Sequence, residues 1–181
     1  MGSTTTTTKS RRVHHAWVAT PLGQSLIAKS ARGVCFCSLA ERGAMKRLTE
    51  WVLRHEPGAE LVPDAKALAP IARQVREYWA GKRRRFDLDL DPRGSEFQLA
   101  VWRAEAAIPW GETRTYAEIA RAIGRGRAAR AVGGATGRNP LPLFVPCHRV
   151  LAAHGIGGFT GGLDQKRALL EREGFSGEFA E

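Results

Sequence analysis

The chain has 181 residues, of which 43% are hydrophobic and 25% charged, and its formal net charge is +10. These fractions are typical of a globular protein that is long enough to bury a sizeable core. No apolar run approaches the length of a membrane-spanning helix, so the sequence excludes a transmembrane protein.

The chain begins with a threonine-rich stretch, and we expect residues 1–12 to form a disordered tail. This stretch lacks the apolar segment of a secretory signal. Gly2 and Thr6 formally fit a myristoylation pattern, but a short threonine tract meets that pattern easily by accident. We therefore predict neither secretion nor a membrane partner.

Residues 13–92 predict an α/β N-terminal domain. Three short β-prone segments separated by turn residues indicate a three-stranded antiparallel meander, over residues 14–20, 25–30 and 33–39. Apolar and acidic residues alternate from Phe86 to Asp91, which predicts one more half-buried strand. The sequence Asp91-Pro92-Arg93-Gly94 breaks this pattern and marks the expected domain boundary.

Two helices are expected between these strands, over residues 40–55 and 65–80. Pro57-Gly58 ends the first of them. Its apolar spacing predicts a buried side made of Met45, Leu48, Trp51 and Leu53.

Residues 93–181 predict a mostly α-helical C-terminal domain. Ser95 with Gln98, and Thr115 with Glu118, have the spacing of capping boxes, which predicts helices over 96–107 and from 115 to Gly124. A third helix is expected over 127–136 with Gly137 as its C′ residue. The last two form a helix-turn-helix pattern. A final helix spans 164–172 and closes at Gly174.

The run Pro146-Cys147-His148-Arg149 carries the candidate chemistry, since a thiolate is a strong nucleophile. From Ile119 to Leu163 the chain has no acidic residue and six arginines. Cationic surroundings lower the pKa of a thiol, so we expect a lowered pKa for Cys147 and chemistry on a polyanion. The plainer alternatives are an inert buried cysteine and a solvated arginine-rich helix face.

His148 is the expected base for Cys147, but neighbours in sequence rarely point the same way, which favours a bridging water between them. The imidazole also needs an acceptor that fixes its tautomer. The carboxylates of the last helix, Glu171 and Glu173, are the candidates.

Three cysteines make an odd number, which favours free thiols in a reducing compartment, the cytoplasm of a bacterium or the nucleus of a eukaryote. Cys35 and Cys37 are expected on one face of a strand. A zinc site that adds His14 or His15 is conceivable, but this spacing is poor for tetrahedral zinc. We predict core packing and no metal.

Several motifs in residues 95–175 agree in order and spacing with one protein family. They are Phe97-Gln98 with Val101-Trp102, Ile108-Pro109-Trp110-Gly111 with Thr115-Tyr116, residues 130–135, Asn139-Pro140, residues 145–150, and Gly161-Gly162 with Lys166, Leu169-Leu170 and Glu173. This part resembles the O6-alkylguanine-DNA alkyltransferases, whereas residues 1–92 match only in outline.

The resemblance implies a partner, double-stranded DNA that contains O6-alkylguanine. The helix-turn-helix would bind in the minor groove, and Arg130 would fill the space left by the flipped guanine. The DNA-binding residues implied are Ala129, Arg130, Gly133, Thr136 and Arg138. We expect a monomer, and the sequence leaves self-association along DNA open.

The resemblance also implies direct repair in a single turnover, in which Cys147 takes the alkyl group. His148 and Glu173 would activate it through water, and Tyr116 would donate a proton to the leaving guanine. The substrate-pocket residues implied are Asn139, Pro142, Val150, Phe159, Thr160 and Lys166. No cofactor is needed, and activity on O4-alkylthymine stays open.

Two other functions compete with this interpretation. A non-catalytic sensor of alkylated DNA would lack the cysteine, which is present at position 147. A Cys-His hydrolase or redox enzyme would turn over a small substrate repeatedly, without dependence on DNA or salt.

Overall fold

The computed structural model describes residues 11–175 and 177, so most of the expected tail lies outside the described residues. Arg12 is already the first residue of a strand. Among the described residues, no helix is long and apolar enough to cross a membrane.

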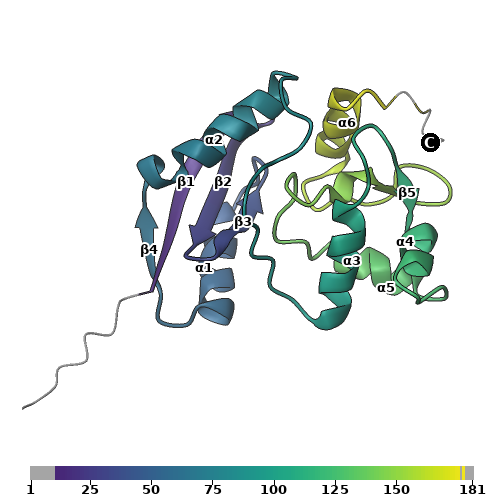
Figure 1. The fold of residues 1–181 in the computed structure, drawn as a ribbon, viewed down its shortest axis with the longest axis horizontal. Helices are drawn as coiled ribbons and strands as arrows, with labels where there is room; N and C mark the ends of the chain where they lie inside the picture. Colours follow the sequence, from purple (N-terminus) through teal and green to yellow (C-terminus); the bar gives the residue numbers. More distant parts are fainter. Residues whose placement is uncertain (1–10, 176, 178–181) are drawn as a thin grey trace, which may run out of the picture.

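The N-terminal part is built on a four-stranded sheet in the order β3-β2-β1-β4 (Figure 1). Its strands are β1 (Arg12–Thr20), β2 (Gly23–Ser30), β3 (Gly33–Ser38) and β4 (Glu60–Pro63). The predicted antiparallel meander of the first three is confirmed. The sheet has a fourth strand, parallel to β1, because a four-residue segment is too short to show alternation in the sequence.

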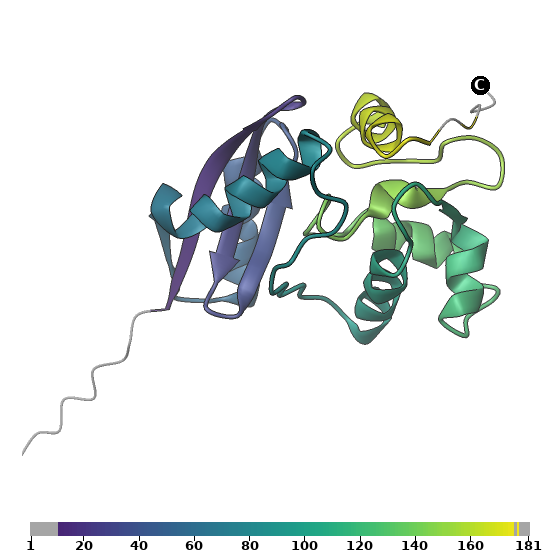
Figure 2. The ribbon, with the colours of Figure 1, turned by 45° about the horizontal axis from the view of Figure 1, so that its top comes forward.

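Two helices cover opposite faces of this sheet, α1 (Ala44–His55) on one side and α2 (Ala65–Trp79) on the other (Figures 1 and 2). Alternation along β2 separates the two cores. Leu26 packs with Leu48 of α1, whereas Ile27 packs with Leu68 of α2. Leu53 is 68% exposed, so its predicted burial is wrong.

The strand predicted from Phe86 to Asp91 is wrong. Only Leu90 forms a bridge, with Val34 at the edge of β3. The side chain of Gln74 donates to the carbonyl of Asp87 at 2.8 Å and accepts from its amide at 2.9 Å. These bonds occupy the backbone groups that a neighbouring strand would need.

The C-terminal part is mostly helical, as predicted. Its elements are α3 (Glu96–Ala106), β5 (Arg114–Thr115), α4 (Tyr116–Ala122), α5 (Ala129–Thr136), the 3₁₀ turn η1 (Cys147–Arg149), β6 (Val150–Leu151) and α6 (Leu163–Arg172). Both predicted capping boxes are present, at the starts of α3 and α4. Gly137 is the C-cap of α5 with a φ of −66°, so its prediction as the C′ residue is wrong by one position.

The two parts share one continuous core. Tyr78 of α2 stacks on Phe86 and meets Trp110 edge-on, and Phe86 in turn contacts Phe144. The amide of Cys37 donates to the carbonyl of Pro140 at 2.8 Å, which ties the edge of β3 to the segment before Cys147.

Candidate active site around Cys147

Cys147 begins the η1 turn, and a polar side chain orders the chain before it. Asn139 donates from Nδ2 to the carbonyl of Val145 and accepts from the amide of Leu141, each at 2.9 Å. Leu143 has a φ of 82°, a left-handed conformation that a non-glycine residue adopts only under constraint. Asn139 therefore holds a tight turn that delivers the cysteine.

Cys147 is 5% exposed and lies in the wall of a cavity of about 280 Å³. Among the other site residues predicted from the sequence, those that line this cavity are Tyr116, Gly133, Thr136, Asn139, Pro142, Phe159 and Thr160. The N-terminal part supplies a further wall of Ser38, Leu39, Glu41 and Arg47, in which Arg47 and Glu41 form an ion pair. Sequence analysis missed this wall because no local pattern links it to Cys147.

Lys166 and Val150 do not line the cavity. Lys166 is fully buried, and its Nζ donates to the carbonyls of Val150 at 2.6 Å, Ile156 at 2.7 Å and Gly158 at 3.2 Å. Burial lowers the pKa of Lys166 to about 8. This side chain fixes the segment that runs behind the cavity.

Behind Cys147 lies a buried network centred on Glu173, the C-cap residue of α6. Its carboxylate meets Nε2 of His148 at 2.9 Å, and it accepts from Nε of Arg149 at 2.7 Å and from the hydroxyl of Tyr78 at 2.9 Å. Burial by itself raises the pKa of Glu173, but the bonds from His148 and Arg149 outweigh it and lower the pKa to about 2. Glu171 is exposed, so Glu173 is the partner of the histidine.

An ionised Glu173 fixes the tautomer of His148. Because a carboxylate only accepts hydrogen bonds, Nε2 carries the proton of the neutral ring. Burial lowers the pKa of His148, which favours that neutral ring. Its Nδ1 is buried and has no hydrogen-bond partner among the described residues. This nitrogen is therefore free to accept a proton.

The thiol of Cys147 is neutral at rest, so the expected lowering of its pKa is wrong. Burial raises the pKa to about 12, the charge of Glu105 adds to that effect, and Asn139 and Lys166 oppose it. The arginines that suggested a cationic site lie elsewhere. Arg149 is bound to Glu173, and the other five of the segment 119–163 are exposed.

Glu105 was not among the candidate residues, yet it lies within electrostatic reach of Cys147. It is fully buried on α3, and Thr136 lies 2.6 Å from its Oε1. One signal in the sequence marks it: Glu105 follows Val101 and Trp102 on the apolar side of a helix.

Tyr116 of α4 and two residues of α5, Gly133 and Thr136, line the cavity. Tyr116 is half-buried, and burial raises the pKa of its hydroxyl, which keeps it a proton donor. Its ring faces Gly133 of α5, where a Cβ would lie 3.8 Å from the ring. Ala129 begins α5, and Arg138, exposed, follows it.

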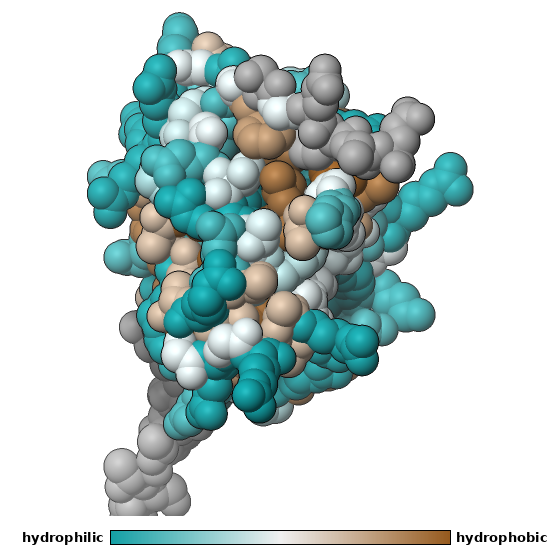
Figure 3. All heavy atoms as spheres, turned by 90° about the vertical axis from the view of Figure 1, so that its right-hand side faces the viewer, coloured by the Kyte–Doolittle hydropathy of each residue, from teal (hydrophilic) through white to brown (hydrophobic). Residues whose placement is uncertain are grey.

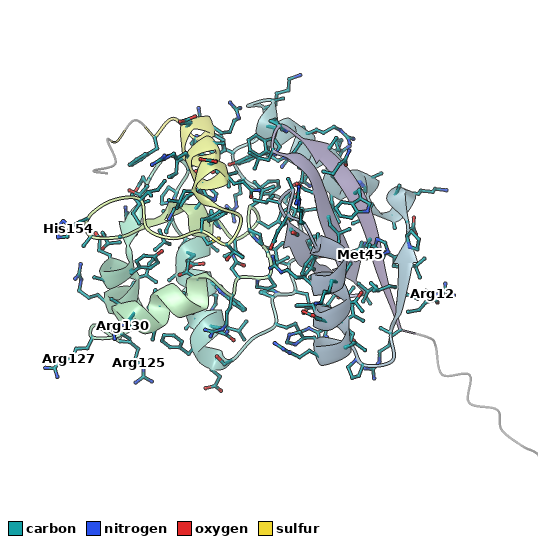
Figure 4. The ribbon with its side chains drawn as sticks, turned by 180° about the vertical axis from the view of Figure 1, so that it is seen from behind. Arg12, Met45, Arg125, Arg127, Arg130 and His154 are labelled. Carbon is teal, nitrogen blue, oxygen red and sulfur yellow. The ribbon has the colours of Figure 1, made fainter. Side chains whose placement is uncertain are left out.

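Exposed arginines surround the start of α5. Figure 4 shows Arg125, Arg127 and Arg130 together at one corner of the C-terminal part. The surface on that side is mostly hydrophilic, with hydrophobic side chains gathered in a strip toward its upper edge (Figure 3). Exposed guanidinium groups of this kind suit phosphate contacts.

The expected shared face of Cys35 and Cys37 is wrong. The register between β2 and β3 shifts at Ala28 and Lys29, which leaves Cys35 as an extra residue. Cys35 packs with the α1 core and Cys37 with the larger core. Both thiols are buried, and burial raises both pKa values.

Two family profiles match the chain. The profile described as "6-O-methylguanine DNA methyltransferase, DNA binding domain" matches residues 96–175, and the "ribonuclease-like domain" of the same name matches residues 13–92.

The chain is similar over most of its length to proteins named methylated-DNA–protein-cysteine methyltransferase. One from Mycobacterium tuberculosis is 40% identical over 89% of this chain and 92% of its own. One from Bacillus subtilis, named inducible, is 40% identical over 81% of this chain and 82% of its own. The crystal structure of the Mycobacterium tuberculosis O6-methylguanine methyltransferase superposes with a TM-score of 0.77 at 40% identity, covering 89% of this chain and 92% of that one. A structure described as Mycobacterium tuberculosis OGT in complex with DNA gives a TM-score of 0.77 at 39% identity, covering 88% and 92%.

Proposed function

The chain belongs to the methylated-DNA–protein-cysteine methyltransferase family, and on that premise we propose that Cys147 is the residue that receives the alkyl group. The protein repairs alkylated DNA by alkyl transfer to a cysteine, and DNA is its partner. One observation carries the assignment: Cys147 lines a cavity and is followed by a histidine whose Nδ1 has no hydrogen-bond partner in the described part of the chain.

The transfer forms one bond and breaks another. The sulfur of Cys147 attacks the alkyl carbon of O6-alkylguanine, the bond from that carbon to O6 breaks, and its electron pair stays with the guanine. The thiol proton moves through a water to Nδ1 of His148, and ionised Glu173 stabilises the resulting imidazolium. The hydroxyl of Tyr116 supplies the proton that the leaving guanine takes up.

The neutral thiol makes this proton transfer part of the reaction. A hydrolase that relies on a resting thiolate needs a lowered thiol pKa, whereas burial raises that of Cys147 to about 12. The product is a thioether, which leaves no nucleophile, so each molecule acts once and needs no cofactor or metal.

The proposed C-terminal domain, residues 93–181, binds the DNA, and the N-terminal domain, residues 13–92, adds one wall of the pocket. Ala129, Gly133, Thr136 and Arg138 lie along or just after α5, which would enter the minor groove. Arg130 would take the place of the flipped guanine.

In the proposed pocket, Tyr116, Pro142 and the loop that carries Phe159 and Thr160 surround the flipped base. Val150 and Lys166 act from behind it through the bond between them. Asn139 acts by holding the turn that carries Cys147.

The proposed compartment is the cytoplasm, where the protein acts as a monomer. The three cysteines are free in the structure, which supports a reducing compartment.

Intact-protein mass spectrometry tests the proposal. After incubation with duplex DNA that contains O6-methylguanine, the protein should gain the mass of one CH2 group, because a methyl group replaces the thiol hydrogen, and Cys147→Ala should gain none. An unmodified wild type, or equal gains in both proteins, contradicts the proposal.

The same assay tests the role of Arg130. Arg130→Ala should slow transfer from duplex DNA far more than transfer from free O6-benzylguanine, since the free base needs no flipping. Arg167→Ala, an exposed arginine on α6, is the matched control. Equal losses on both substrates would remove the flipping role.

A further inference from the structure

The contact between Glu105 and Thr136 is best satisfied when Glu105 is protonated. The Thr136 hydroxyl lies 2.6 Å from Oε1 of Glu105 and 2.9 Å from the carbonyl oxygen of Val132. A hydroxyl has one hydrogen, so it cannot donate to both. If Glu105 is protonated, it donates to Thr136, Thr136 donates to Val132, and both contacts are hydrogen bonds. An ionised Glu105 leaves one contact between two acceptors.

The surroundings of Glu105 offer no cation that pairs with it. The side chain is fully buried, its Oε2 has no partner, and it forms no ion pair within the described part of the chain. The titratable groups that face it are Tyr116 from α4, Cys147 from η1 and Lys166 from α6. The amino group of Lys166 is bound by three carbonyls. An isolated carboxylate in such a place neutralises instead of staying charged.

The pair also connects two helices at the wall of the reaction cavity. Trp102 and Glu105 are one turn apart on α3, and Trp102 donates from Nε1 to the carbonyl of Ala135 at 3.0 Å. Together they hold the last turn of α5, where Thr136 lines the cavity. Burial raises the pKa of Glu105 to about 7, against the charge of Lys166.

We propose that Glu105 is a positioning residue for the alkyl transfer and that it acts in its protonated form. As an acid it holds Thr136 and places no negative charge beside Cys147. As a carboxylate it loses one contact and opposes formation of the thiolate. Glu105 keeps its proton throughout the reaction, and the proton of the thiol leaves toward His148. The inference rests on the proposed role of Cys147.

The rate of transfer from free O6-benzylguanine, measured from pH 6 to pH 9, tests this inference. Glu105→Gln copies the protonated acid, because its amide also donates to Thr136. The ratio of the variant rate constant to the wild-type one should rise roughly tenfold across this range, the effect of a neighbouring like charge that shifts a thiol pKa by about one unit. The titration of His148 cancels in the ratio because Glu105 does not shift its pKa. The charge of Glu105 also raises the pKa values of Lys166 and Tyr116, and these effects enter the ratio.

Glu96→Gln is the matched control, since Glu96 is an exposed carboxylate on the same helix. Its rate ratio to the wild type should stay constant from pH 6 to pH 9. A constant ratio for Glu105→Gln, in proteins that do react, overturns the inference. If neither protein reacts, the proposed function fails instead.

Difference infrared spectra give a second test that does not depend on reaction. The wild-type spectrum minus that of Glu105→Gln should contain the carbonyl band of a protonated carboxyl group at pH 6, and this band should vanish by pH 9. Absence of the band at pH 6 overturns the inference, even if the variant changes the rate.

Discussion

Two buried carboxyl groups act near Cys147, and they lie in opposite kinds of surroundings. Glu173 pairs with His148 and accepts bonds from Arg149 and Tyr78. His148 and Arg149 lower its pKa to about 2. Glu105 contacts the hydroxyl of Thr136 and forms no ion pair with any residue that the structure describes, and burial raises its pKa to about 7. Burial penalises both charges, so the donors around each group decide whether it is ionised.

This difference matches the task of each side of the site. The ionised carboxylate lies against the base, where it favours an imidazolium. The neutral acid lies on the side of the nucleophile, where a second negative charge would oppose the thiolate. Substitutions can break this contrast in two ways, by removing a donor that binds Glu173 or by removing the carboxyl group of Glu105.

The largest effect is expected on the ionised side. Arg149→Met leaves the carboxylate of Glu173 buried without its guanidinium, which should lower the free energy of unfolding by about 3–5 kcal/mol. Urea unfolding at pH 7 measures it. Arg114→Met is the control, because its ion pair with Glu112 is 42% and 49% exposed and should change stability by at most about 1 kcal/mol. Equal losses in both variants would remove the contrast.

On the neutral side, the effect of Glu105 on the free energy of unfolding depends on pH. Glu105 has a folded-state pKa near 7, above its usual 4.5, so its contribution to stability is full below pH 4.5 and is lost as pH rises toward 7. The free energy of unfolding of Glu105→Leu, taken relative to that of the wild type, should therefore rise by about 3 kcal/mol between pH 4.5 and pH 8. Denaturant unfolding at several pH values checks this. A stability difference that does not change with pH contradicts the neutral acid.

The smallest effect belongs to the uncharged bond beside Glu105. Trp102→Phe removes the bond to the carbonyl of Ala135 and should lower stability by about 1–2 kcal/mol at every pH. Trp17→Phe, at a position that is 49% exposed, should change almost nothing. Thermal unfolding of both variants at pH 5 and pH 8 measures the effect. A loss that grows with pH would mean that Trp102 acts through the charge of Glu105.

Local patterns predicted much of this fold. The capping boxes at Ser95 and Thr115 set the starts of two helices, because a cap depends on residues three positions apart. The meander was equally clear from its turns. The fourth strand and the bulge at Cys35 were missed, since both depend on pairing with distant segments.

In the candidate site too, features set by local sequence were predicted and features set by folding were missed. Cys147 and His148 are adjacent in the chain and were evident from the sequence. Their electrostatics were not, because a run of arginines in sequence says nothing of where the guanidinium groups point. Glu105 and the wall that contains Arg47 are close to Cys147 only after folding.

The most direct test of the central claim is to locate the transferred group among the three cysteines. Trypsin releases Cys147 in the peptide 139–149 and both other cysteines in the peptide 33–42. After reaction with duplex DNA that contains isotopically labelled O6-methylguanine, the label should be found in the peptide 139–149, at one methyl group per protein molecule. Label in the peptide 33–42, or more than one methyl group released from DNA per molecule of protein, would contradict the account.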